Sequence, residues 1–197
     1  MERLIECNRS AVALMRQGET IAAFSLFRTA MEVLLELPTK RQDGRKTSLQ
    51  TLSIAVDDTA SPQNTFCLFS KALDLSMDMD RSTAAAVLCF NQALGCHLRG
   101  ISSSSDCFST ELLVEAFHYY QCVLTTASLD HMALSMAVQT NLGHLHSHLG
   151  YGSVADSYRE NLRSLLLVTD ERSMDIDDYL LALWNVSFRK ADQAPAA

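Results

Sequence analysis

The sequence predicts an all-α protein, and three observations point to this class. The chain has seven Gly and three Pro in 197 residues, about 5% together where average usage gives roughly 12%. Apolar residues recur at intervals of three, four and seven positions, which is the periodicity of an amphipathic helix. Short segments containing Asn recur in the same phase within these apolar stretches. A chain so poor in turn-forming residues is unsuited to a sandwich or barrel of many strands.

The first two helices are expected at residues 2–17 and 19–36. Their apolar residues fall on one stripe each, and Pro38 ends the second helix because its ring cannot continue one. Gly18 alone separates the two helices. They are therefore expected to fold back on each other as an antiparallel hairpin.

Residues 39–65 are predicted to form a partly extended insertion. A charged loop at 40–46 is followed by a loose alternation of apolar and polar residues from 48 to 56. We expect this insertion to lie on the helices as a strap, since its apolar residues favour burial. Weak helical patterning is predicted to resume at 66–76.

Five further helices are expected after this strap. Ser82 is the predicted N-cap of the first of them, residues 100–106 are predicted to be a flexible loop, and residues 191–197 a frayed tail. The predicted helices span residues 83–99, 110–126, about 131–149, 153–168 and 177–189.

A repeated motif places Asn inside an apolar helix, with a small residue two positions later. Gly100 and Gly150 follow two of these small residues after seven further positions. A small residue at that point is expected to let a neighbouring helix approach closely. The motif occurs as Phe90-Asn91-Gln92-Ala93, Thr140-Asn141-Leu142-Gly143 and Trp184-Asn185-Val186-Ser187.

On these residues the chain resembles the tetratricopeptide repeat (TPR) family, whose unit is a helix hairpin of about 34 residues. The best match joins Gly143, Gly150 and Ala155, and departures include Val123 and Leu162 where the family has Ala. Further matches are Gly18, Ala23, Phe27 and Ala30 in the first hairpin, and Ala116, Tyr120 and Leu124 in the middle one. The Asn of the repeated motif recurs after 50 and then 44 residues, whereas the family's unit has about 34, and the difference indicates inserted loops.

The resemblance implies a right-handed αα-superhelix of about three TPR-like hairpins plus a C-terminal helix, in a single domain over residues 1–190. Stacking of neighbouring hairpins would create the core. The concave groove, lined by the first helix of each hairpin, would bind a peptide or partner helix. The partner-binding positions implied in this way are Phe90, Leu94, His97, Thr140, His144, His148 and Trp184. Alternatively, residues 48–76 of the chain itself would occupy the groove in place of a partner.

Histidines 144, 146 and 148 are the one cluster that suggests a metal site. His144 and His148 lie four residues apart on one helix face, a spacing that can bind Zn²⁺. No third ligand follows from a recognisable motif, and no nucleotide-binding, hydrolase or zinc-protease motif occurs. We therefore predict a non-catalytic interaction scaffold without a cofactor. A metal-binding sensor or enzyme centred on His144 and His148 is the alternative.

The charge and cysteine content favour an intracellular, cytoplasmic protein. Lys and Arg number 16 against 23 Asp and Glu, a net charge of −7, so neither nucleic acid nor an anionic membrane is an expected ligand. The six cysteines form no CxxC pair and are expected to be reduced. Asn8-Arg9-Ser10 and Asn185-Val186-Ser187 match the glycosylation pattern, which we discount inside helices of an intracellular protein. Association of the chain with further copies of itself is a second interaction that the sequence allows.

Overall fold

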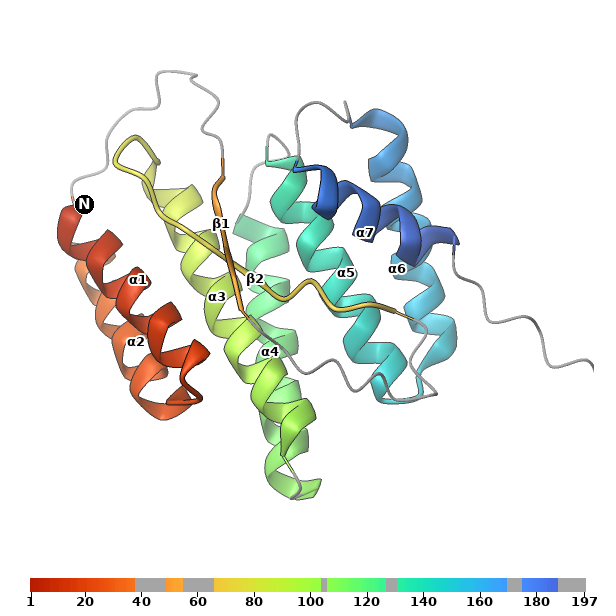
Figure 1. The fold of residues 1–197 in the computed structure, drawn as a ribbon, viewed down its shortest axis with the longest axis horizontal. Coiled ribbons are helices and arrows are strands. Elements are labelled where there is room, and N and C mark those ends of the chain that lie inside the picture. Colours follow the sequence, from red (N-terminus) through yellow and green to blue (C-terminus); the bar gives the residue numbers. More distant parts are fainter. Residues whose placement is uncertain (38–48, 55–65, 104–105, 127–130, 170–174, 188–197) are drawn as a thin grey trace, which may run out of the picture. The chain divides into compact units, whose positions relative to one another are not determined.

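The computed structural model describes residues 1–37, 49–54, 66–103, 106–126, 131–169 and 175–187. These residues form seven α-helices and one pair of short strands (Figure 1). The prediction of a mostly helical protein is therefore confirmed. The chain divides into two compact units, residues 1–57 with 70–134 and residues 58–69 with 135–197.

The first unit contains two helix hairpins. Helices α1 (Glu2–Arg16) and α2 (Thr20–Glu36) are joined at Gly18, whose φ of 79° lies in the left-handed region that glycine adopts without strain. Helices α3 (Arg81–Ser102) and α4 (Asp106–Thr126) form the second hairpin, in which Ser82 donates to the carbonyl of Thr126 at 3.1 Å. The first two helices and their hairpin are confirmed within one or two residues.

Two details of α3 correct the sequence prediction. The N-cap is Asp80 rather than Ser82, and its carboxylate accepts the Thr83 N–H at 2.9 Å. The helix also continues through Gly100, which is buried, so the predicted loop at 100–106 begins too early. A Cβ on Gly100 would lie 2.8 Å from Cδ2 of Leu113 on α4. Glycine is retained in the helix because α4 approaches it closely at this point.

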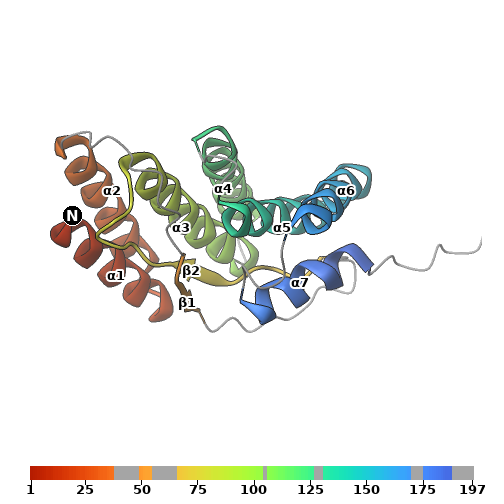
Figure 2. The same ribbon diagram turned by 90° about the horizontal axis from the view of Figure 1, so that it is seen from above.

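A short antiparallel strand pair completes the first unit. Strand β1 (Thr51–Ser53) pairs with β2 (Lys71–Leu73) in a register that sets Leu52 opposite Ala72. Both views show β2 running beside α3 (Figure 1, Figure 2). The extended conformation predicted for 48–56 is confirmed at β1. The charged loop at 40–46 lies outside the described residues.

The second unit contains most of α5 (Met132–His148), together with α6 (Gly152–Val168) and α7 (Ile176–Ser187). Gly150, with φ of 81°, makes the turn between α5 and α6. The prediction of these three helices is confirmed. The predicted end of the last helix at 188–189 and the predicted tail at 191–197 lie outside the described residues.

The weak helical pattern at 66–76 gave a wrong prediction, because this stretch is extended and carries β2. Its apolar residues are nevertheless buried, as the pattern required: Phe66, Leu68, Phe69, Ala72, Leu73 and Leu75 are all at most 7% exposed. Both an apolar helix face and a strand buried on two sides can have such a composition.

Candidate peptide-binding site

Four asparagines on α1, α3, α5 and α7 have completely buried side chains. A carboxamide carries donors and acceptors that must be satisfied when water is excluded. In all four cases the partners include the main chain of the extended residues 66–75, which we call the bound segment. The asparagines are Asn8, Asn91, Asn141 and Asn185.

In the first unit, Asn91 binds both main-chain groups of Leu73. Its Oδ1 accepts the Leu73 N–H at 2.8 Å, and its Nδ2 donates to the Leu73 carbonyl at 2.8 Å. Asn8 donates to the same carbonyl at 3.1 Å and accepts a second bond from Asn91 at 2.8 Å. Both hydrogens of the Asn91 amide are thereby used.

In the second unit, two asparagines repeat the same arrangement. Asn141 accepts the N–H of Phe69 at 2.8 Å and donates to its carbonyl at 3.1 Å. Asn185 accepts the N–H of Cys67 at 2.6 Å and donates to its carbonyl at 3.0 Å. Each of these asparagines thus binds one residue of the segment through both of its main-chain groups.

The alternation of an extended chain explains this pattern. Successive residues of a strand point their N–H and C=O groups to opposite edges, so residues 67 and 69 can face the asparagines of the second unit together. In the first unit Leu73 faces asparagines, whereas Ser70 and Asp74 face the two residues that flank β1. The main-chain carbonyl of Ser70 accepts the N–H of Ile54 at 3.2 Å, and the N–H of Asp74 donates to the carbonyl of Gln50 at 2.8 Å. Each of these asparagine bonds to the segment is made to a main-chain N–H or C=O group.

Gly143 contacts the bound segment rather than a helix. A Cβ added at Gly143 would lie 2.8 Å from Cδ1 of Phe66 and nearer still to two other ring atoms. The small residue that follows Asn141 was expected to admit a neighbouring helix. In the structure it provides the space that the Phe66 ring fills, and that expectation is corrected.

The predicted partner-binding residues divide by exposure. Phe90, Leu94 and His97 have no exposed surface, and the first and third of these lie near the ring of Tyr120, with centroid distances of 5.9 and 6.0 Å. Thr140 and His144 are also buried. His148 is exposed and Trp184 is 54% exposed. Five of the seven therefore lie in the interior, and their role in partner binding stays a prediction.

The asparagines themselves were not predicted as binding residues. Asn91, Asn141 and Asn185 served to mark the repeat, and Asn8 and Asn185 were otherwise considered only as parts of glycosylation patterns. A signal was present, because Asn8 is also followed two positions later by a small residue, Ser10. The same Asn-x-small rule therefore finds all four.

His144 and His148 do stack, with ring centroids 6.3 Å apart and planes at 10°. Burial, and secondarily the charge of His148, lowers the pKa of His144 to about 3. His146 faces away from them, stacked on Tyr158 of α6 at 5.4 Å. Within the described ranges, no group of three His, Cys, Asp or Glu residues is placed to hold a metal ion. The metal alternative stays a prediction, which metal analysis of the purified protein tests.

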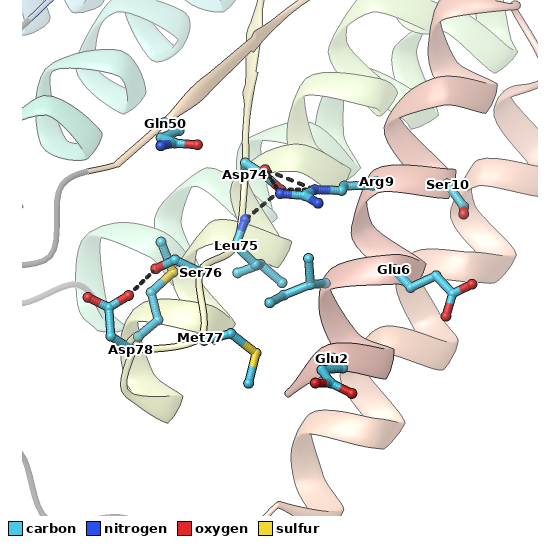
Figure 3. Close-up of a pocket in the computed structure, with 12 residues that line it drawn as sticks. Glu2, Glu6, Arg9, Ser10, Gln50, Asp74, Leu75, Ser76, Met77 and Asp78 are labelled. Carbon is cyan, nitrogen blue, oxygen red and sulfur yellow. Dashed lines mark hydrogen bonds and ion pairs between the residues drawn. The ribbon is translucent and has the colours of Figure 1, made fainter.

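A pocket of about 770 Å³ opens beside the bound segment in the first unit, between α1 and residues 74–79 (Figure 3). Arg9 reaches from α1 to the buried carboxylate of Asp74, with nitrogen–oxygen distances of 2.6 to 3.1 Å. Hydrogen bonding to Asp74, together with its charge, raises the pKa of Arg9. This ion pair fixes the segment just beyond Leu73.

In comparisons with known proteins, no protein-family model, curated protein or solved structure matches the chain. In the part of the chain that the structure describes, no helix has the length and apolar character needed to cross a membrane.

Proposed function

We propose that this chain is a non-catalytic, TPR-like protein-interaction scaffold, intracellular, whose asparagines bind an extended peptide by its main chain. In this proposal the bound segment is an internal ligand that a partner replaces. The finer architecture, a right-handed αα-superhelix over residues 1–190, belongs to the same proposal. The observation that carries it is the two-point hydrogen bonding of Asn91, Asn141 and Asn185, each to one residue of an extended chain.

Main-chain recognition of this kind suits exchange of one segment for another. Every residue except proline offers one N–H and one C=O, so a partner segment in the same register can make the same bonds. Peptide recognition through main-chain bonds, with side-chain pockets supplying specificity, is a general mode of binding. Without a segment, each asparagine would lose its bonds to that main chain, and each buried group left unsatisfied costs about 1–3 kcal/mol.

The internal segment is a strong competitor. Burial of one large apolar side chain stabilises by roughly 1.5–3 kcal/mol, and Phe66, Leu68 and Phe69 are all buried in the second unit. A covalently attached segment also acts at an effective concentration in the mM range. We therefore expect the unmodified chain to bind added peptides weakly, and binding to increase when the segment is weakened.

The test uses a fluorescein-labelled peptide of residues 64–76 and the double variant Phe66→Ala/Phe69→Ala, which weakens the internal segment and leaves the asparagines intact. Fluorescence anisotropy should show at least tenfold tighter peptide binding to the double variant than to the unmodified chain. Adding Asn141→Ala to the double variant should reduce that affinity at least tenfold. A peptide of scrambled sequence is the control. A folded double variant that binds no peptide would overturn the proposal.

Hydrogen exchange on the unmodified chain keeps the proposal testable where the double variant does not fold. We expect the amides of Cys67 and Phe69 to exchange through an opening that costs less free energy than global unfolding. Helix amides such as that of Leu142 should exchange only through global unfolding. Exchange of both sets at the same free energy would show that the segment is a permanent part of the fold.

A further inference from the structure

Phe66 occupies a small site built from two helices of the second unit. Its ring fills the space left by the missing side chain of Gly143 on α5. The guanidinium carbon of Arg159, on α6, lies 4.6 Å from the ring centroid. Phe66 itself is 5% exposed, so the ring is enclosed by these groups and their surroundings.

Arg159 is held in this position by polar contacts to Asn185 and Asp156. It is only 3% exposed. Its Nε donates to the carbonyl of Asn185 at 2.9 Å, and its Nη1 pairs with the carboxylate of Asp156 one turn earlier on α6. A buried guanidinium fixed over a ring interacts more strongly with the ring than one in water does.

We infer that Gly143 and Arg159 form an anchor site for an aromatic side chain in whichever segment occupies the asparagines. This inference rests on the proposed function and deepens it by naming the kind of partner. The aromatic residue precedes by one position the residue that Asn185 binds, and by three the residue that Asn141 binds. The partner is therefore an extended segment with an aromatic residue, any residue and then two apolar residues, as in Phe66-Cys67-Leu68-Phe69.

The chemistry of the site favours an aromatic ring over an aliphatic side chain of similar size. Glycine offers a flat surface without a Cβ, which a planar ring can contact closely. The face of an aromatic ring attracts a cation through its quadrupole, and a saturated ring has no such attraction. The main-chain bonds to Asn141 and Asn185 set the register of the segment. The anchor site would then select the side chain at the position that Phe66 occupies.

The experiment compares labelled peptides of residues 64–76 on the Phe66→Ala/Phe69→Ala chain, whose own segment no longer fills the anchor site. Position 66 of the peptide is Phe, cyclohexylalanine, Leu or Ala. We expect the cyclohexylalanine and Leu peptides to bind about tenfold more weakly than the Phe peptide, and the Ala peptide more weakly still. Equal binding of the Phe, cyclohexylalanine and Leu peptides would overturn the anchor site and leave the proposed function standing. Binding of none of them would overturn the proposed function.

A substitution in the protein provides the matching half of the test. Gly143→Ala in the same variant should weaken the Phe peptide at least tenfold and leave the Ala peptide unchanged, because only the ring meets the added Cβ. Gly152→Ala is the matched control, since nothing lies within 4 Å of a Cβ added there. Equal loss for both peptides would contradict a site specific for the ring.

The intact chain offers a second measurement if the double variant does not fold. Phe66→Leu and Arg159→Met, singly and together, form a double-mutant cycle read by the urea midpoint. The anchor site predicts that the combined loss is smaller than the sum of the single losses. Additive losses would show that the ring and the guanidinium do not act together and would overturn the inference.

Discussion

The side-chain amide of Asn91 donates to the side-chain oxygen of Asn8 at 2.8 Å, and both residues donate to the carbonyl of Leu73. These two residues lie 83 positions apart in sequence. Their contact links the first helix of one hairpin to the first helix of the next within the first unit. The bond also orients the Asn91 amide, because it fixes which end of the carboxamide carries the hydrogens.

Replacing Asn91 tests how much this network stabilises the fold. Asn91→Leu keeps a side chain of similar size but leaves the N–H of Leu73 and the oxygen of Asn8 without their partner. We expect a loss of about 3 kcal/mol in the free energy of unfolding, since each unsatisfied buried group costs about 1–3 kcal/mol. Urea unfolding followed by circular dichroism measures it.

Asn161 provides the control for this change. It is an exposed asparagine on α6, with a single long side-chain bond of 3.3 Å to Gln139. Asn161→Leu should change the stability by less than about 0.5 kcal/mol. Equal effects at the two sites would mean that the buried network contributes little.

Two glycine substitutions test the close approach of α3 and α4. Gly100→Ala places a Cβ against Leu113 and 3.3 Å from the carbonyl oxygen of Ser109, so we expect a loss of about 1–3 kcal/mol from overpacking. Gly152→Ala, with open space around it, should be neutral or stabilising by up to about 1 kcal/mol. Thermal unfolding of the two variants gives the comparison. A Gly100→Ala chain as stable as the Gly152→Ala chain would contradict the packing described.

His144 should make the protein less stable as the pH falls. Its pKa is about 3 in the folded chain and about 6.5 when unfolded, so below pH 6.5 the unfolded state binds a proton that the folded state does not. Stability is thus full above pH 6.5 and is lost as the pH falls towards 3. The expected loss from this residue at pH 5 is about 2 kcal/mol.

The measurement for His144 is urea unfolding at pH 7 and pH 5. The variant His144→Gln should lose less stability over that interval than the unmodified chain. His148→Gln, which removes the exposed neighbour, should keep most of the pH dependence. The same pH dependence in the His144→Gln chain as in the unmodified chain would exclude this residue as its cause.

Cysteine reactivity should follow burial. Burial, with a smaller contribution from Glu115, raises the pKa of Cys96 to about 12, whereas Cys122 is exposed. Since the thiolate is the reactive form, iodoacetamide at pH 8 should alkylate Cys122 in the folded protein and Cys96 only after unfolding. Mass spectrometry of the native protein gives the order. Early alkylation of Cys96 would show that α3 opens readily.

The repeat of Asn and a small residue was the most informative sequence signal, although its meaning was only partly predicted. The phase correctly marked equivalent positions on α3, α5 and α7. The group that packs against Gly143 was predicted wrongly, because an approaching helix and an aromatic ring both require a residue without a side chain. The stretch 66–76 was misassigned for a related reason. Its apolar spacing fits a buried strand and a helix face equally well.

The sequence by itself determined the helices, the turns at Gly18 and Gly150 and the repeating asparagines, because helix periodicity and turn residues act over a few positions. The tertiary structure decided what those asparagines bind. Asn141 and Phe69 lie 72 positions apart, and Asn185 and Cys67 lie 118 apart. A buried carboxamide must find a partner, but local sequence does not specify which main-chain groups the fold brings to it.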